Sequence, residues 1–407
     1  MNALGRLIGI PEPKFAADHW GRAPLLTRAQ DNPDGALGDL FDNAAADTLL
    51  ADRGLRTPFL RVAKDGRTYA AADFTAPGGV GAEIGDQLDD TKLLDLFAGG
   101  ATLVLQGLHR TWSPIREFAA DLAADLGHPV QVNAYVTPPQ NTGFSDHYDV
   151  HDVFVVQVAG TKTWRIRPPV LRHPLRTQPW ENRRDAVREA ATRPPLLEAT
   201  LEPGDTLYLP RGFVHAATAC GAVSTHLTIG IHTWTGHHLG ERLLAYAARR
   251  LAADPDVRAS LPLGIDLTDP SAVTDPAVAH AIETARAALQ EALREAPADV
   301  LIRELTGPGR AATRPAPVGP IAAVEAAAEL TGDSVVVLRR HLAPALTTAG
   351  DGFVLESRAG RQAVALADVG AVRDLLDHGR VRAEVLGTDL ARRLVRGGVV
   401  HVERASR

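Results

Sequence analysis

Two kinds of hydrophobic pattern divide this chain near residue 232. Between residues 102 and 232, apolar, β-branched and aromatic residues gather in short runs that Gly or Pro separate, as is typical of strands. Beyond residue 232, apolar positions recur at spacings of three and four, as is typical of amphipathic helices. The pattern therefore predicts a β domain followed by helices.

The β region contains one expected helix among several expected strands. Apolar residues at helical spacing predict a helix over residues 113–126, which Gly127 ends. The expected strands are residues 102–106, 130–136, 152–158, 163–167, 205–209 and 224–231. Short strands at such close spacing favour a barrel or a sandwich.

The second half of the chain is predicted to be mainly helical. Amphipathic helices are expected at 239–251 and 276–295, and the Gly- and Pro-rich run 307–320 has the composition of a linker. The elements expected beyond it are helices at 321–330 and 334–341, a hairpin at 352–366, helices at 369–378 and 389–396, and a strand at 399–402. Helices beside a β wing suggest a winged-helix-like module.

Composition narrows the class of protein. The 407 residues are 45% hydrophobic and 23% charged, with a net charge of −6, which does not suit a general binder of nucleic acid or anionic membranes. No leader-like start and no run of about 18 apolar residues is found, so we expect a cytoplasmic protein without a membrane span. The single Cys220 excludes an internal disulfide and thiolate metal clusters. Any metal must therefore be held by His and carboxylate side chains.

Charge also bears on the winged-helix-like module. Residues 321–407 hold 12 Arg and no Lys against six Asp and five Glu, so the net charge is 12 − 11 = +1. Phosphate binding needs a clustered excess of basic charge. Direct nucleic-acid binding is therefore not expected, and protein docking or support of a dimer is the favoured role.

Three polar residues in the β region form a candidate metal site. His147 and Asp149 stand at i and i+2, so on an extended strand both side chains point to one side. His215 follows at the end of a later β run, which a barrel brings back to the same mouth. Two imidazoles and one carboxylate on one face leave octahedral positions open, as an oxygen-activating Fe(II) centre requires. These three residues are the expected metal ligands.

Neighbouring residues are weaker candidates. His151 stands two residues beyond Asp149, but one short strand does not easily supply three facial ligands. His226 and His232 alternate with apolar residues, which favours a structural role or, at most, a place in the pocket wall. Cys220 is interpreted as a small apolar filler.

Longer motifs around these residues resemble those of the JmjC-domain oxygenases, and within them the ribosomal oxygenase group. The resemblance runs through nearly the whole chain and includes the stretches at 152–160 and 209–215. It implies an α+β fold with a double-stranded β-helix, or cupin, barrel at 1–235, a helical dimerisation region at 236–306 and a winged-helix-like domain at 321–407. The chain is thus expected to form a homodimer.

The same resemblance implies an enzyme and its co-substrate residues. Members are Fe(II)- and 2-oxoglutarate-dependent hydroxylases that use O2 and release succinate and CO2, and known members modify His or Arg in ribosomal proteins. The family's co-substrate lysine falls on Lys162, and its Asn and Tyr fall on Asn133 and Tyr135. A buried carboxylate needs such a cation and such donors. Thr228, inward on a late strand, is a further candidate donor.

Alternatives remain open at this stage. The site equally suits a hydroxylase of a peptide natural product or a JmjC lysine demethylase, and a catalytically silent cupin binding module is the rival from another class. The chain departs from the family at His151, where Gln or another polar residue is common, and at Ala159, where Glu is common. Both positions are expected near the mouth of the barrel, where they bear on substrate choice.

Overall fold

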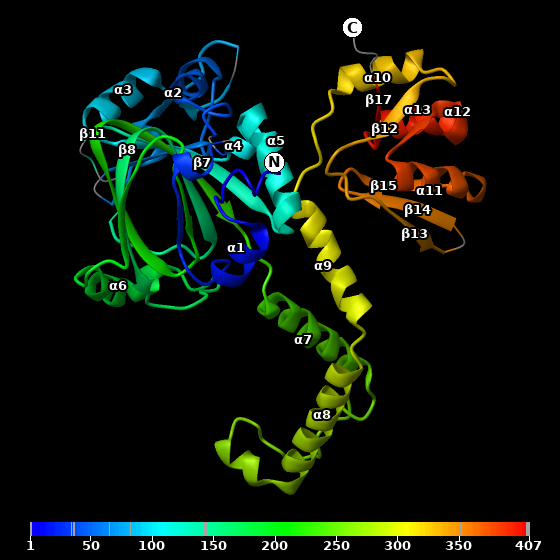
Figure 1. The fold of residues 1–407 in the computed structure, drawn as a ribbon. Helices are drawn as coiled ribbons and strands as arrows, with labels where there is room; N and C mark the ends of the chain where they lie inside the picture. The colour runs from blue at the N-terminus through cyan, green and yellow to red at the C-terminus, as the bar shows by residue number, and fades with distance from the viewer. Residues whose placement is uncertain are drawn as a thin grey trace. The chain divides into compact units, whose positions relative to one another are not determined.

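The computed structural model describes residues 2–403 apart from 34, 36, 65, 82, 140, 142–144 and 351. The chain divides into two compact units, Met1–Thr233 with Thr313–Arg407, and Trp234–Ala312 (Figure 1). Part of the predicted loop before His147 lies outside the described residues. Among the described residues, no helix has the length and apolar character needed to cross a membrane.

A nine-stranded sheet forms the body of the first unit. Its order is β1-β10-β8-β11-β7-β6-β2-β3, and β9 pairs with β8. The strands are β1 (Leu25–Thr27), β2 (Leu60–Lys64), β3 (Arg67–Thr68), β6 (Thr102–Leu105), β7 (Val130–Thr137), β8 (Asp152–Pro169), β9 (Leu197–Leu201), β10 (Thr206–Leu209) and β11 (Phe213–Ile231), and a separate pair joins β4 (Thr75–Ala76) to β5 (Gln87–Leu88). The strands curve around a common interior in Figure 1.

Two long antiparallel strands, β8 and β11, run through both sides of this barrel. Their pairing extends from Asp152↔Ile231 to Pro169↔Phe213, with register shifts at Phe213/Val214, Cys220/Thr225 and Thr225/His226. The first part of β8 pairs with β10 and the second with β9. The separate strands predicted at 152–158 and 163–167 are thus two parts of one strand. The two parts form one continuous strand because Gly160, at φ 59°, bends the chain without ending the strand.

The bend at Gly160 leads to a stability prediction. A Cβ at this position would lie 2.2 Å from the carbonyl oxygen of Val223, in addition to the strain of a positive φ. Gly160→Ala should therefore lower the free energy of unfolding by about 3 kcal/mol. Gly221→Ala is the matched control, because its φ is +73° but nothing lies within 4 Å of the added Cβ. Its free energy of unfolding, measured by urea titration, should fall by only about 1 kcal/mol. Equal losses in the two variants would contradict the steric explanation.

Strand β7 packs its apolar side chains against the helices outside the barrel and turns its polar side chains inward. Val132, Ala134 and Val136 share one core with the helices that cover this side, notably with Ile115 and Leu122. Because strand side chains alternate, Asn133 and Tyr135 face the barrel interior. The helices of this side are α1 (Glu12–Asp18), α2 (Asn43–Asp47), α3 (Asp90–Ala98), α4 (Leu108–Thr111) and α5 (Ser113–Leu126). α5 confirms the helix predicted at 113–126.

A second apolar cluster lies on the other side of the barrel. It includes Val155, Trp164 and Leu207 from β8 and β10. In a separate, smaller cluster, Val187 of helix α6 (Arg184–Ala191) packs with Tyr148 and Val214. Tyr148 and Val214 are each the sequence neighbour of a candidate ligand. Their burial therefore fixes the backbone on which the candidate site depends.

The second unit is helical and consists of α7 (Gly236–Ala253), α8 (Pro276–Glu295) and α9 (Ala298–Ala312). The helices predicted at 239–251 and 276–295 are confirmed. The predicted linker is wrong in its first part, because α9 continues through Pro308 to Ala312. A proline inside a helix removes one backbone hydrogen bond and can kink the helix without ending it.

Residues 320–402 have a hydrophobic core of their own. Their elements are α10 (Pro320–Glu329), β12 (Val335–Leu338), β13 (Ala345–Ala349), β14 (Gly352–Ser357), β15 (Gly360–Val364), α11 (Val369–His378), β16 (Arg380–Arg382), α12 (Ala383–Leu386), α13 (Thr388–Arg396) and β17 (Val400–Val402). The hairpin predicted at 352–366 is confirmed as β14 and β15. The helix predicted at 334–341 is wrong, because a run of β-branched Val residues forms strand β12 between β16 and β17.

Candidate metal centre

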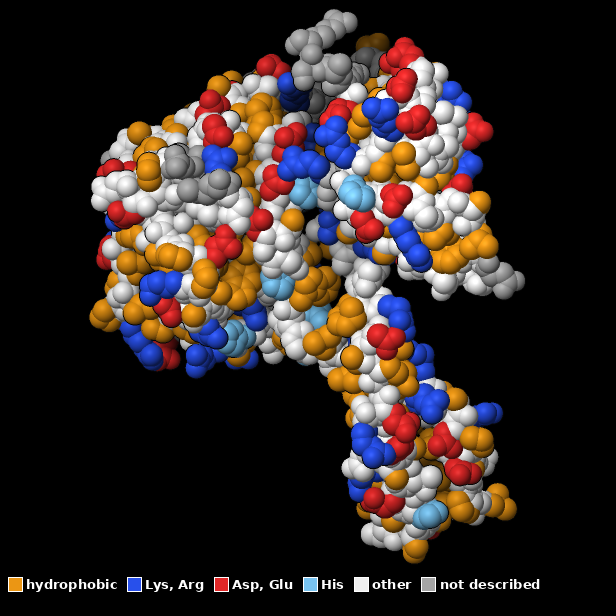
Figure 2. Space-filling view, turned by 45° about the vertical axis from the view of Figure 1, so that its right-hand side comes forward, with side chains coloured by type: hydrophobic (Ala, Val, Ile, Leu, Met, Phe, Trp, Pro, Cys, Tyr) orange, Lys and Arg blue, Asp and Glu red, His pale blue; other side chains and the backbone are white. Residues whose placement is uncertain are grey.

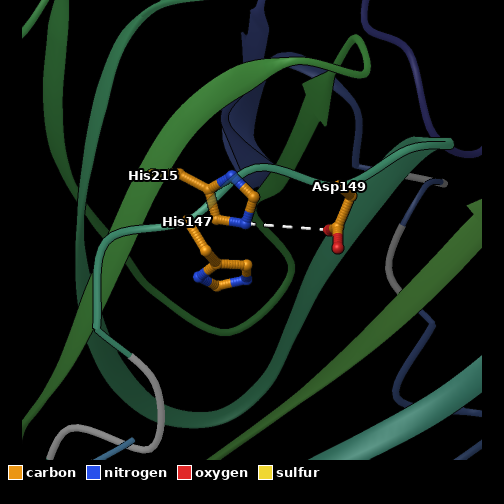
Figure 3. A group of neighbouring side chains, drawn as sticks. All are labelled: His147, Asp149 and His215. Carbon is orange, nitrogen blue, oxygen red and sulfur yellow. Dashed lines mark ion pairs between the residues drawn. The ribbon is translucent and has the colours of Figure 1, made fainter. Parts of the chain in front are cut away.

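The side chains of His147, Asp149 and His215 meet at one end of the barrel (Figure 3). One ligand atom from each residue lies within 4.8 Å of the others, and His215 Nε2 is 3.7 Å from Asp149 Oδ2. Donors that share one octahedral ion stand about 3 Å apart, so small side-chain movements would bring all three onto it. Among the described residues, His151 does not belong to this set.

Both imidazoles present the same ring nitrogen to the site. His147 Nδ1 lies 2.7 Å from the carbonyl oxygen of Ser145, and His215 Nδ1 lies 3.0 Å from that of Phe213. A carbonyl oxygen only accepts, so each Nδ1 carries the proton and donates it. Each Nε2 is then left with its lone pair. Such backbone contacts are how proteins fix the tautomer and orientation of metal-binding histidines.

Backbone contacts hold the three residues in register. His147 N donates to His215 O at 3.1 Å, and His215 N donates to His147 O at 2.8 Å. Gly212 N also donates to the carbonyl of Asp149 at 3.0 Å. The two segments that supply the candidate ligands are therefore fixed to each other before any ion binds.

A buried ion pair joins the same two segments. Arg211 donates to Asp152 Oδ1 through its backbone N and its Nη1, each at 3.1 Å, and Tyr208 donates to Asp152 Oδ2 at 2.6 Å. Asp152 is fully buried and Arg211 nearly so. Because Asp152 follows Asp149 by three residues and Arg211 precedes His215 by four, this pair restricts both ligand-bearing segments.

The electrostatics of the site favour cation binding. Burial, together with the neighbouring His147, lowers the pKa of His215 to about 4. Burial alone would raise the pKa of Asp149, but His151, His215, His147 and Arg61 together hold it below its usual value. At neutral pH the site thus presents a neutral imidazole lone pair and an ionised carboxylate, the protonation states that a metal ion requires.

A pocket of about 570 Å³, part of it open to solvent, leads from the three residues into the barrel. Its lining is His147, Asp149, His215, Thr102, Tyr135, Val153, Val155, Lys162, Trp164, Leu209, Ala217, His226 and Thr228. Lys162 is only 4% exposed, and its Nζ donates to Thr137 Oγ1 at 3.1 Å. Burial lowers its pKa to about 7. A buried ammonium that contacts a neutral hydroxyl is suited to an anionic ligand.

The other predicted co-substrate residues differ in position. Tyr135 and Thr228 line the pocket as expected. Asn133 does not, since its Oδ1 accepts from the backbone N of Gly107 at 3.0 Å. Asn133 pairs with Thr228 across β7 and β11, so it lies on the same inward row. Its amide is thus partly committed to holding the start of α4.

Sequence reasoning missed several residues of this pocket. Thr102 and Trp164 line it. His226, for which a place in the pocket wall was left open, does line the pocket and lies flat on Tyr135, with ring centroids 5.0 Å apart. A side-chain hydrogen bond links Arg61 to Tyr135. The positive charge of Arg61 also lowers the pKa of Asp149. Only the strand register could have revealed Arg61, because Arg61, Val104 and Tyr135 form one row across β2, β6 and β7.

Comparisons with known proteins are consistent with this geometry. The JmjC domain family matches residues 112–239. Ribosomal oxygenase 1 of Gallus gallus is 31% identical over 254 residues, which are 61% of this chain and 40% of that protein. The bifunctional lysine-specific demethylase and histidyl-hydroxylase NO66 of Aedes aegypti is 41% identical over 101 residues, 25% of this chain and 15% of that protein. This chain thus spans less than half the length of these curated relatives.

Solved structures show the same fold. The ribosomal oxygenase YcfD of Escherichia coli superposes with a TM-score of 0.53 and 17% identity, over 98% of this chain and 99% of that one. A second structure of YcfD, in complex with cobalt and 2-oxoglutarate, gives a TM-score of 0.53 over 97% and 99%. At this identity the likeness concerns the fold alone, which is that of YcfD.

Proposed function

Because this chain is a JmjC-domain protein, we propose that it is an Fe(II)- and 2-oxoglutarate-dependent oxygenase that hydroxylates a protein side chain. The observation that carries the proposal is a single pocket with a two-histidine, one-carboxylate group at one end and the buried Lys162 at the other. A binding module needs neither group. The YcfD structure that holds cobalt and 2-oxoglutarate supports the same pairing of metal and co-substrate.

Residues of the chain fit both ligands. His147, Asp149 and His215 would hold the metal through two Nε2 atoms and a carboxylate oxygen, which leaves further octahedral positions open. Lys162 and the Tyr135 hydroxyl would bind the distal carboxylate of 2-oxoglutarate, with Thr228 and Asn133 on the adjoining inward row. When bound, Fe(II) and 2-oxoglutarate supply O2 activation and C–H oxidation, with release of succinate and CO2.

The remaining wall of the pocket excludes water from this chemistry. Val153, Val155 and Leu209 are almost fully buried and line the pocket between its two ends. An apolar wall strengthens the attraction between Lys162 and a carboxylate, because few water molecules compete for either charge. The chain thus contributes binding, orientation and exclusion of side reactions.

The substrate proposed is a ribosomal protein, hydroxylated on His or Arg. The name ribosomal oxygenase supports a ribosomal protein as substrate, and the name histidyl-hydroxylase supports His as the modified residue. Mass spectrometry of ribosomal proteins from cells with and without the gene should show one His or Arg that is about 16 Da heavier only when the gene is present. Loss of lysine methyl groups instead would favour demethylation, and an unchanged set of ribosomal proteins would contradict the ribosomal substrate.

The depressed pKa of Lys162 predicts how co-substrate affinity depends on pH. Binding of a carboxylate needs the ammonium form, which is present below the pKa of about 7. Above that pH, binding must draw in a proton, so affinity should fall by up to about tenfold per pH unit. Calorimetric titration of the Mn(II)-loaded protein with 2-oxoglutarate in two buffers should show proton uptake approaching one per site near pH 8.

Lys162→Arg is the control for this pH dependence, because a guanidinium stays charged throughout this range. Its affinity for 2-oxoglutarate should be independent of pH, whatever its absolute value. If the wild-type protein also binds without proton uptake, Lys162 is fully protonated in the empty pocket and the proposed linkage is wrong.

We further propose that the chain is a cytoplasmic homodimer in which unit Trp234–Ala312 provides the dimerisation region and residues 321–407 form a winged-helix-like domain. Large apolar side chains are exposed on the helical unit, including Leu244, Ile282 and Ile302. Figure 2 shows apolar and charged side chains intermixed over the visible surface of this unit. Sedimentation equilibrium tests the dimer: Leu244→Glu should shift it toward monomer.

A further inference from the structure

Arg61 on β2 is hydrogen-bonded to Tyr135 on β7, although strand β6 lies between them. Arg61, Val104 and Tyr135 stand opposite one another on the three strands, so their side chains share the inward face of the sheet. Neighbouring strands are about 4.8 Å apart, which places the ends of this row roughly 10 Å from each other. Because Val104 is short and fully buried, the longer Arg61 side chain can extend across it to the Tyr135 hydroxyl.

This contact sets the direction of the Tyr135 hydroxyl. A guanidinium has N–H donors and no acceptor, so Arg61 donates and the Tyr135 oxygen accepts. Burial raises the pKa of Tyr135, so the hydroxyl keeps its own proton at neutral pH. That proton must point away from the guanidinium. Tyr135 is therefore arranged as a hydrogen-bond donor to an acceptor in the pocket.

Stacking fixes the ring of Tyr135 as well. The ring lies on His226 of the paired strand β11, with centroids 5.0 Å apart and an interplanar angle of 11°. His226 in turn meets Trp164 edge to face, at 5.4 Å and 88°. All three rings line the pocket. The stack sets the plane of the Tyr135 ring and Arg61 sets the direction of its hydroxyl proton, so the two contacts leave this side chain little freedom.

Lys162 lies beside Tyr135 at the same part of β7. Its Nζ donates to Thr137 Oγ1 at 3.1 Å, and Thr137 follows Tyr135 by two residues, which places it on the same face about 7 Å along the strand. Burial, together with the charge of Lys162, lowers the pKa of His226, the ring that stacks on Tyr135. An ammonium and a hydroxyl proton are thus available in one part of the pocket, where one carboxylate would accept from both.

Asp149 is a competing acceptor for the same proton. Besides burial, two charges act on the pKa of Tyr135: Arg61 lowers it and Asp149 raises it. Asp149 is therefore close enough to attract the Tyr135 proton, and the positive charge of Arg61 offsets this attraction. Arg61 also contributes to the low pKa of Asp149, after the three neighbouring histidines. An effect of Arg61 through Tyr135 must accordingly be separated from an effect through Asp149.

We propose that Arg61 is a positioning residue for the co-substrate: by donating to the Tyr135 oxygen, it directs the Tyr135 proton toward the distal carboxylate of 2-oxoglutarate. This inference rests on the proposed oxygenase function and deepens it. Arg61 is not among the described residues that line the pocket, so it acts through Tyr135 and not by contact with the co-substrate.

The test is a double-mutant cycle on the full-length, Mn(II)-loaded protein, with the Kd for 2-oxoglutarate measured by calorimetry. Arg61→Met keeps a long side chain that cannot donate, and it should raise the Kd about five- to twentyfold, as expected for one lost hydrogen bond to a charged group. Tyr135→Phe should raise the Kd at least as much. When Arg61→Met is added to Tyr135→Phe, the Kd should change less than about twofold, because the hydroxyl on which Arg61 acts is gone.

Two further variants control for charge and for folding. Arg61→Lys keeps a positive charge and an N–H donor, so it should recover part of the affinity that Arg61→Met loses. Arg67→Met removes an exposed arginine from the neighbouring strand β3 and should bind 2-oxoglutarate as the wild type does. The affinity for Mn(II), measured on every variant before 2-oxoglutarate is added, reports whether the metal site is intact, and it should not fall in Arg61→Met.

The possible failures are distinguishable. A wild-type protein that loads Mn(II) but binds no 2-oxoglutarate would overturn the proposed function, and the role of Arg61 with it. Wild-type affinity in Arg61→Met, or a loss just as large in the Tyr135→Phe background, would overturn the role of Arg61 alone. A lower Mn(II) affinity in both Arg61→Met and Arg61→Lys would do the same, because it would assign Arg61 to Asp149 or to the fold.

Discussion

Replacing Asp149 with alanine is expected to abolish turnover of 2-oxoglutarate. Asp149 is the one carboxylate of the candidate metal site, and its pKa is held low by the surrounding cationic and imidazole groups. Without it, two neutral imidazoles must bind a divalent ion with no charge compensation. Succinate formation at saturating co-substrate should fall more than about a thousandfold, and Fe(II) affinity should fall with it.

Asp185→Ala is the matched control, because the Asp185 side chain on α6 is 95% exposed and its ion pair with Arg188 lies on the surface. Turnover of this variant should stay within about twofold of wild type. If Asp149→Ala bound Fe(II) and formed succinate at the wild-type rate, the metal site would have to be elsewhere in the chain.

Lys162→Met is expected to remove co-substrate binding while stabilising the empty protein. The buried ammonium has Thr137 Oγ1 as its recorded hydrogen-bond partner, and its pKa of about 7 records the free-energy cost of burying it. Loss of a buried charge partner costs about 3–5 kcal/mol, so the KM for 2-oxoglutarate should rise between about a hundredfold and several thousandfold. In the absence of 2-oxoglutarate, the midpoint of thermal unfolding should rise at neutral pH, because an apolar side chain needs no desolvation.

Lys14→Met controls for loss of a positive charge, since Lys14 is exposed and pairs with Asp18 on the surface. It should change neither the KM nor the thermal midpoint appreciably. The combination of weaker co-substrate binding and higher stability separates a functional lysine from a structural one. A Lys162→Met protein that unfolds earlier and keeps its KM would identify Lys162 as a structural residue.

Local pattern predicted most of the elements of this fold. The runs of β-branched residues located β7, β10 and the second part of β11, and helical spacing located α5, α7 and α8. The errors have physical reasons. Gly160 suggested a break between two strands, but glycine also permits a bend that keeps the strand pairing, so β8 is continuous. At 334–341, long-range pairing with β16 and β17 favoured a strand where local spacing indicated a helix.

Some residues of the candidate site were predicted from the sequence and others were not. Spacing alone suggested His147 and Asp149, because two residues on one strand share a face, and the resemblance to JmjC oxygenases pointed to Lys162. What the sequence could not give was the side-chain environment. Arg61 reaches Tyr135 only through the order of strands β2, β6 and β7. The contact of His151 with His232 likewise depends on how β8 and β11 align, which no local pattern reveals.

Anaerobic titration of the metal-free protein with Fe(II) and 2-oxoglutarate tests the central claim most directly. A chelating keto acid on Fe(II) gives a visible charge-transfer band, so the band should appear with about one equivalent of each ligand and should be absent from Asp149→Ala. In Lys162→Met it should appear only at much higher 2-oxoglutarate concentration. Absence of the band from the wild-type protein, or an unchanged band in Asp149→Ala, would contradict the assignment of His147, Asp149 and His215 as the metal centre.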